Sequence, residues 1–216
     1  MTTRVLIADD QPMVRSGLGL MLETHGIEVV AEAADGADAV RLARELRPDV
    51  CLLDVRMPSL DGLEATRRLA GPDVADPIPV VVVTTFDLDE YVRGAIQNGA
   101  SGFLLKDAGP RLFVEAVHAA VNGDALISPS VTVRFLQHFA AASATRSYGT
   151  DVLSDREEEI VVAVARGRTN QEISGELFIS ISTVKSHLTN IQTKLGLRNR
   201  VEVAGWAWEK GRMHNN

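Results

Sequence analysis

The 216-residue sequence predicts an α/β domain with a doubly wound, five-stranded parallel sheet, followed by an all-α domain of four helices. Three observations support this prediction. Short apolar runs alternate with segments of helical periodicity over the first 122 residues, as in a series of βα units. The apolar runs are nearly continuous, which is typical of strands that are covered on both faces of a sheet. After residue 150, helix-capping signals recur at short intervals.

The first domain is expected over residues 1–122. Apolar residues at positions 14, 18, 21 and 22 form one helical stripe, and those at positions 39, 42, 43 and 46 form another. Helical crossovers of this length place successive strands side by side in one parallel sheet. The strands are expected at the apolar runs 5–8, 27–31, 50–53, 80–83 and 103–105.

A linker is expected at residues 123–149, and within it residues 129–142 can form a short helix. Small and polar residues at 142–150 favour a connecting segment. The helical domain is then expected over residues 150–216.

Four helix starts are predicted in this second domain. Ser154 precedes Glu157 by three positions, which is the spacing of a capping box, and Thr169 precedes Glu172 in the same way. A third helix is expected from Ser180 to about Leu195, and a fourth from Asn199 or Arg200.

The net charge of −7 is unevenly distributed along the chain. Residues 1–149 hold 13 basic and 20 acidic residues, whereas residues 150–216 hold 9 of each. Within 166–212 there are eight basic and four acidic residues, so a basic segment follows an acidic domain. Nucleic-acid binding by the second domain is therefore compatible with an acidic chain.

The composition argues against several classes of protein. Cys51 is the only cysteine, which excludes an internal disulfide, and we expect it to fill the core of the third strand. No apolar run approaches the ~20 residues of a membrane span, and the N-terminus lacks the pattern of a signal peptide. We expect a cytoplasmic protein that does not bind membranes.

Polar residues directly follow four of the expected strands. Because ligands of open α/β sheets bind beyond the carboxyl ends of the strands, these side chains are expected to converge on one rim. Clustered carboxylates repel one another unless a cation neutralises them, and Mg²⁺ is the natural cation where phosphate is handled. The residues are Asp9 and Asp10 after the first strand, Asp54 after the third, Thr84 after the fourth and Lys106 after the fifth.

This group of residues can form an aspartyl-phosphate. A carboxylate beside Mg²⁺ can attack a phosphoryl group, and the metal and Lys106 then balance the charge on the transferred oxygens. Thr84 can hydrogen-bond the new phosphoryl group. Taken singly, Asp54 is better explained as a turn or cap residue and Lys106 as a surface charge. Their joint occurrence at successive strand ends favours the functional interpretation.

The first domain resembles the receiver domain of two-component response regulators, which has a flavodoxin-like fold. The resemblance covers about residues 4–122. It implies that Asp54 accepts phosphate from a histidine kinase, and that Asp9 or Asp10 binds Mg²⁺ with Asp54 and the backbone carbonyl of Arg56. Thr84 and Phe103 resemble the pair that reports phosphorylation to the opposite surface. The sequence departs from many receivers at Asp107, where proline is usual. The matching segments are 5–10, 48–58, 61–62, 84–86 and 99–106.

The third helix of the second domain has two distinct faces. Val184, Leu188, Ile191 and Leu195 form an apolar stripe that is expected to face the core. The opposite face is polar, which suits the major groove of DNA but is also usual for a solvated helix. Nearby residues can bind phosphates. The DNA contacts that we predict are Thr169, Asn170, Ser182, Lys185, Ser186, His187, Thr189, Arg198 and Arg200.

This half is similar to the LuxR-type helix-turn-helix, and the two halves together define the NarL/FixJ class of response regulators. The motifs fall within 153–157, 167–173, 177–187 and 194–200. The resemblance implies that residues 180–195 are the recognition helix, with Lys185 as its best-placed DNA contact and His187 near a phosphate. Departures are mild and occur at Arg168 and Ser174. Trp206 and Trp208 are expected to serve core or dimer packing.

We therefore expect a phosphorylation-controlled regulator that binds double-stranded DNA at promoter half-sites and forms a homodimer when phosphorylated. We do not expect an enzyme, because no substrate cleft or external general base is evident. The alternative is a signalling adaptor or phosphorelay protein whose helical domain binds protein instead of DNA. Salt-dependent binding to duplex DNA distinguishes the two.

Overall fold

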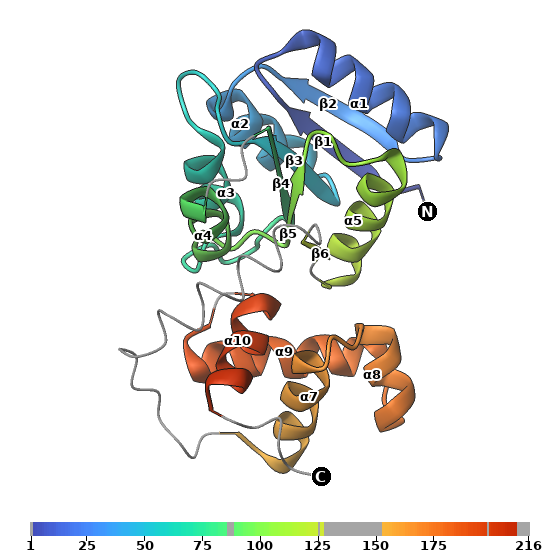
Figure 1. Cartoon of the computed structure of the whole chain (residues 1–216), viewed down its shortest axis with the longest axis vertical. Coiled ribbons are helices and arrows are strands. Elements are labelled where there is room, and N and C mark those ends of the chain that lie inside the picture. The colour runs from blue at the N-terminus through green and yellow to red at the C-terminus, as the bar shows by residue number, and fades with distance from the viewer. Residues whose placement is uncertain (1, 86–88, 125, 128–152, 198, 211–216) are drawn as a thin grey trace. The chain divides into compact units, whose positions relative to one another are not determined.

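The computed structural model describes residues 2–85, 89–124, 126–127, 153–197 and 199–210. It divides into two compact units, Met1–Thr132 and Val133–Asn216 (Figure 1). The predicted helix at 129–142 and the predicted DNA contact Arg198 lie outside the described residues.

The first unit alternates strands and helices, as the sequence predicts. Each predicted strand is present and its bounds differ by a few residues at most. The elements are β1 (Arg4–Ala8), α1 (Pro12–Thr24), β2 (Glu28–Ala33), α2 (Gly36–Leu46), β3 (Val50–Asp54), α3 (Gly62–Ala70), β4 (Val80–Thr84), α4 (Asp89–Gln97), β5 (Gly102–Leu105), α5 (Pro110–Asn122) and β6 (Leu126–Ile127).

The sheet is parallel throughout and has the strand order β2-β1-β3-β4-β5-β6. The predicted doubly wound α/β fold is confirmed. A sixth strand, β6, pairs with β5 inside the segment that we predict to be a linker. Two residues are too few for a periodic signal, so this strand could not be read from the pattern. The reversal of strand order lies between β1 and β3, which places their carboxyl ends at the expected ligand-binding rim.

Helices cover both faces of the sheet. Helices α1 and α5 lie on one face, and α2, α3 and α4 lie on the other (Figure 1). Alternate residues of each strand therefore enter different cores. The core beneath α1 and α5 includes Val5 and Ile7 of β1, Val81 and Val83 of β4, and Leu104 of β5.

The second unit contains the four predicted helices. They are α7 (Asp155–Ala165), α8 (Asn170–Leu177), α9 (Ile181–Leu195) and α10 (Arg200–Glu209). Ser154 and Thr169 form the two predicted capping boxes, and Ser180 caps α9 through the backbone N–H of Thr183. The apolar stripe of α9 is buried in one core with Ile160, Ile173 and Trp206. Across the described ranges, no helix has the length and apolarity that a membrane span requires.

Candidate functional site

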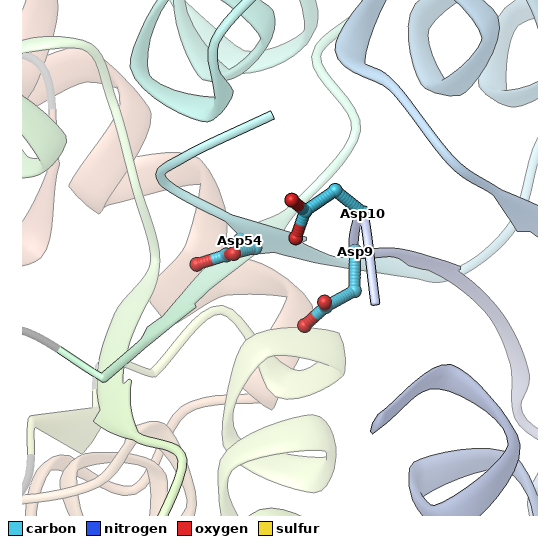
Figure 2. Close-up of side chains that lie close together, drawn as sticks. All are labelled: Asp9, Asp10 and Asp54. Atoms are coloured by element: carbon cyan, nitrogen blue, oxygen red, sulfur yellow. The ribbon is translucent and has the colours of Figure 1, made fainter. Parts of the chain in front are cut away.

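Three carboxylates gather where β1 and β3 end (Figure 2). One ligand oxygen from each of Asp9, Asp10 and Asp54 lies within 4.8 Å of the others. Asp9 is 1% exposed and Asp54 is 5% exposed, whereas Asp10 is exposed to solvent. The predicted convergence of these strand ends is therefore present in the structure. Like charges at this spacing repel, so the cluster favours a cation.

Lys106 bridges two of the three carboxylates. Its Nζ lies 2.6 Å from Asp9 Oδ2 and 2.9 Å from Asp54 Oδ2. The position of Lys106 is fixed by the sheet, because its backbone N–H donates to the carbonyl of Thr84 at 2.8 Å. One ammonium against three carboxylates leaves two negative charges, which matches the charge of one divalent metal ion.

Burial and pairing act in opposite directions on these groups. Burial raises the pKa of Asp54, and the hydrogen bond and charge of Lys106 offset this only in part. Burial lowers the pKa of Lys106, but its bonds to Asp9 and Asp54 outweigh burial and the pKa lies above the ordinary value. Lys106 is therefore a cation at neutral pH. Its positive charge only partly offsets the cost of burying the Asp54 carboxylate.

The loop after Asp54 is held close to the strand end. The Gly62 N–H donates to the Val55 carbonyl at 2.9 Å, and the Gly36 N–H donates to the Leu60 carbonyl at 3.1 Å. A Cβ atom on Gly62 would lie 1.8 Å from the Asp54 carbonyl oxygen. Only glycine permits this approach, so α3 begins directly against the backbone of Asp54.

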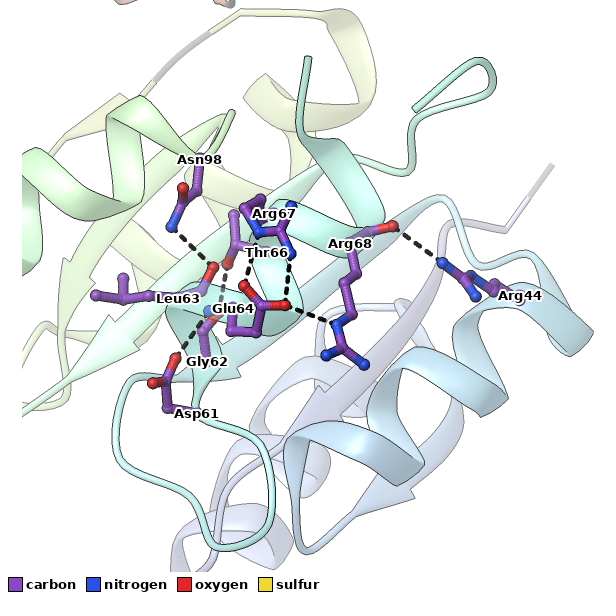
Figure 3. A network of polar contacts seen from close by, with 9 residues as sticks. All are labelled: Arg44, Asp61, Gly62, Leu63, Glu64, Thr66, Arg67, Arg68 and Asn98. Atoms are coloured by element: carbon purple, nitrogen blue, oxygen red, sulfur yellow. Dashed lines mark hydrogen bonds and ion pairs between the residues drawn. The ribbon is translucent and has the colours of Figure 1, made fainter. Parts of the chain in front are cut away.

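Helix α3 is fixed to its neighbours by a polar network (Figure 3). Asp61 caps its N-terminus by accepting from the Glu64 N–H at 2.8 Å, and Glu64 in turn pairs with Arg67 and Arg68. Asn98, which follows α4, donates to the Leu63 carbonyl at 2.9 Å. Asp61 thus joins the end of the loop after Asp54 to α3, and Asn98 joins α3 to the end of α4.

Thr84 and Phe103 lie on the same face of the sheet. Their strand neighbours Val83 and Leu104 belong to the core beneath α1 and α5, so Thr84 and Phe103 face the α4 side. Thr84 is fully buried and Phe103 is 1% exposed. From the same rim, the side chain of Arg56 reaches α4 and donates to the Tyr91 hydroxyl at 3.0 and 3.2 Å.

A magnesium site fits the residues that are present. Mg²⁺ prefers oxygen ligands and usually retains several waters, so two or three carboxylates on a partly open rim suffice. Asp10 supplies the exposed side, while Asp9 and Asp54 supply the buried side. Lys106 pairs with Asp9 and Asp54, so its charge and that of one Mg²⁺ ion together balance the three carboxylates.

Helix α9 presents the predicted polar face. Ser182, Lys185, Ser186 and Thr189 are exposed, and His187 is half-buried. The hydroxyls of Ser186 and Thr189 donate to helix carbonyls one turn earlier, at 3.0 and 3.1 Å. Their oxygens therefore remain available outward as acceptors. This face can meet hydrogen-bond donors on base edges.

Three other predicted DNA contacts are engaged within the protein. We expected Asn170 to be exposed at the start of α8, and this is wrong, because it is 1% exposed. Its Oδ1 accepts from Arg200 Nη1 at 2.7 Å, and Arg200 also donates to the Arg168 carbonyl. Thr169 is exposed, but its hydroxyl takes part in the capping box with Glu172. Asn170 therefore positions Arg200 and is not itself a surface contact.

Sequence reasoning missed two residues near the acidic cluster. Arg15 of α1 donates to the Asp9 carbonyl at 2.6 Å, and its Nε lies 3.4 Å from Glu32 of β2. A single arginine within a helical pattern gives no sign of such contacts. They depend on the packing of α1 over β1 and β2.

Two family models match the chain. Residues 5–118 match the response regulator receiver domain, and residues 151–207 match the bacterial regulatory proteins of the luxR family. The two matched segments coincide with the α/β unit and the helical unit described above.

The chain also matches known proteins over nearly its whole length. The chain is 41% identical over 205 residues to the transcriptional regulatory protein LiaR of Bacillus subtilis, covering 94% of this chain and 96% of that protein. It is 36% identical over 213 residues to the oxygen regulatory protein NreC of Staphylococcus aureus, covering 96% and 97%. The crystal structure of the response regulator ChrA of a heme-sensing two-component system aligns with a TM-score of 0.53 at 36% identity, covering 98% of each chain.

Proposed function

The chain belongs to the two-component response regulators that join a receiver domain to a LuxR-type DNA-binding domain, and we propose that Asp54 is its phosphoacceptor. Members of this family are phosphorylation-controlled, DNA-binding regulators of transcription. The observation that carries the proposal is the arrangement of Asp54 beside two further carboxylates, with Lys106 bridging Asp54 and Asp9. The incomplete compensation of Asp54 suits a nucleophile.

The proposed reaction transfers a phosphoryl group from the phosphohistidine of a histidine kinase. A carboxylate oxygen of Asp54 forms a bond to phosphorus, the P–N bond breaks, and the imidazole leaves. Asp9, Asp10, Asp54 and the Arg56 carbonyl would hold Mg²⁺, which would supply positive charge opposite the transferred oxygens. Lys106 already lies 2.9 Å from Asp54 and stabilises the new phosphoryl group.

The proposed output begins at Thr84. Its side chain turns toward the phosphoryl group, and Phe103 takes up the space that is released on the α4 side of the sheet. The phosphorylated protein then forms a homodimer on paired half-sites. Ser182, Lys185, Ser186, His187 and Thr189 of α9 meet the DNA, with Arg198 and Arg200 near phosphates. A cytoplasmic location follows from these partners.

Phosphorylation of Asp54 is tested by intact-mass measurement after incubation with acetyl phosphate and Mg²⁺. We expect one added phosphoryl group on the wild type and none on Asp54→Asn. Asp49→Asn is a matched control, because Asp49 precedes the same strand but accepts from the Arg4 backbone instead. Equal phosphate on wild type and Asp54→Asn would contradict the assignment.

DNA binding is tested by the salt dependence of the affinity for duplex fragments selected with the phosphorylated protein. Lys185→Ala should weaken binding and lower the slope of log affinity against log salt by about 1. Arg41→Ala removes an exposed cation from α2 of the other unit and serves as the charge-matched control. Binding without salt dependence would favour the adaptor interpretation of the helical domain.

A further inference from the structure

The two acidic residues after β1 are held very differently. Asp9 is fixed at both ends, because its Oδ1 accepts from the Gln11 N–H at 2.9 Å and its N–H donates to the Ala33 carbonyl at 3.2 Å. Lys106 contacts its Oδ2. Among the described residues, the Asp10 carboxylate has no hydrogen-bond or ion-pair partner. Its direction is therefore set by the backbone of the turn.

Arg15 of α1 contacts the backbone of that turn. Its Nη1 donates to the Asp9 carbonyl oxygen at 2.6 Å, which is the peptide group that joins Asp9 to Asp10. The side chain is 16% exposed, and its buried Nε lies 3.4 Å from Glu32 Oε2. Glu32 directly precedes Ala33, whose carbonyl accepts from Asp9. Arg15 and β2 thus hold the two successive peptide groups on either side of the Asp9 Cα atom.

We propose that Arg15 is a positioning residue for the metal site, which orients the Asp9–Asp10 peptide so that both carboxylates point into the pocket. The inference rests on the proposed function of that pocket. Residues that hold metal ligands in place commonly change metal affinity by 10–100-fold when they are replaced. The fork of arginine is suited to this position, because one nitrogen reaches the carbonyl while another pairs with Glu32.

Electrostatics alone gives the opposite expectation. Arg15 is a cation beside a cluster that is expected to bind a cation, so removing its charge should strengthen Mg²⁺ binding. Positioning predicts weaker binding for the same substitution. The sign of the change in affinity therefore separates a positioning role from a mere charge near the site.

The experiment is a Mg²⁺ titration of the full chain, followed by backbone amide NMR shifts at the ends of β1 and β3. We expect the dissociation constant to rise about tenfold in Arg15→Gln and in Arg15→Lys, because lysine keeps the charge but loses the fork. Glu32→Gln should give a smaller rise. Arg41→Gln, an exposed arginine of α2 that pairs with Asp38 and Glu45, should leave the constant unchanged.

Tighter Mg²⁺ binding in Arg15→Gln, or an unchanged constant in both Arg15 variants, would overturn the proposal. Melting of each variant without Mg²⁺ checks that the fold is kept, and Arg15→Lys is the milder change if Arg15→Gln unfolds. At saturating Mg²⁺ the Arg15 variants should still take up one phosphoryl group from acetyl phosphate. Failure of the wild type in that assay would instead remove the proposed function.

Discussion

Each unit of the molecule buries a carboxylate beside a lysine, and the two clusters differ in how completely the carboxylate charge is compensated. In the helical unit, Glu157 accepts from the Ser154 N–H at 2.8 Å, the Ser154 hydroxyl at 3.0 Å and Lys194 at 2.7 Å. One negative charge meets one positive charge and two neutral donors. In the receiver, three carboxylates lie close together, and Lys106 contacts only two of them, Asp9 and Asp54.

The pKa values follow this difference. Burial alone would raise the pKa of Glu157, but its hydrogen bonds to Lys194 and Ser154 outweigh burial and lower it. For Asp54, burial prevails over Lys106 and the pKa is raised. A buried carboxylate with enough hydrogen-bond and charge partners stabilises its fold. A buried carboxylate with too few partners destabilises the fold, and a bound cation or a reaction of the carboxylate can relieve this cost.

The largest contrast is expected in the response to a phosphodonor. Acetyl phosphate with Mg²⁺ should strengthen DNA binding of the wild type and of Glu157→Gln, and should leave Asp54→Asn unchanged, because Asp54 is the proposed phosphoacceptor. Fluorescence anisotropy with labelled duplex measures the affinities. A full response in Asp54→Asn would remove the distinction between the two clusters.

For stability, the substitution of Glu157 should have a larger effect on the helical unit than the substitution of Asp54. Glu157→Ala removes one half of a capping box and leaves Lys194 without its partner, so the helical unit should lose about 2 kcal/mol of unfolding free energy. Trp206 and Trp208 are the only tryptophans, so their fluorescence follows this unit alone. Asp54→Asn should leave that fluorescence transition in place. A loss below about 0.5 kcal/mol in Glu157→Ala would mean that the pair is not structural.

Mg²⁺ should stabilise one unit only. At a free concentration about ten times the dissociation constant, binding to the folded state contributes about 1.4 kcal/mol. Hydrogen exchange should slow in the amides of β1 and β3 and remain unchanged in α7 and α9. Equal protection in both units would indicate that the ion acts on the whole surface.

The smallest contrast is expected in how the stability of the two units changes at acid pH. The pKa of Glu157 is lowered from 4.5, so its contribution is present above that pH and is lost as the pH falls through the folded-state pKa. The pKa of Asp54 is raised from 3.8, so the receiver loses stability as the pH rises from that value through the folded-state pKa. Glu157→Gln should flatten the acid limb of the tryptophan transition, because the neutral amide does not titrate. An unchanged acid limb would contradict the lowered pKa of Glu157.

Sequence patterns were sufficient where the physics is local. Continuous apolar runs gave the five longer strands, and the Ser154 and Thr169 capping boxes gave the starts of α7 and α8 to within one residue. The acidic cluster was also predictable, because parallel strands must end at one rim. Asp9, Asp54 and Lys106 meet there as expected.

Contacts that depend on tertiary packing were not predictable. Arg15 reaches the Asp9 carbonyl only because α1 crosses β1, and Glu157 meets Lys194 across 37 residues of sequence. Asn170 occupies an N-terminal helix position that is usually exposed, yet α10 covers it through Arg200. The steric demand at Gly62 likewise depends on how closely the loop returns to β3.

The two units should also differ in how quickly they fold. Capping boxes set the ends of α7 and α8 within four residues, whereas the first unit must bring Val5 beside Val50 before β1 and β3 can pair. Distant pairings of this kind make parallel sheets slow to form. A ribosome makes the slower unit first, and the 84 residues of Val133–Asn216 take roughly 4–17 s to synthesise. That interval lets the sheet mature before the faster helices emerge.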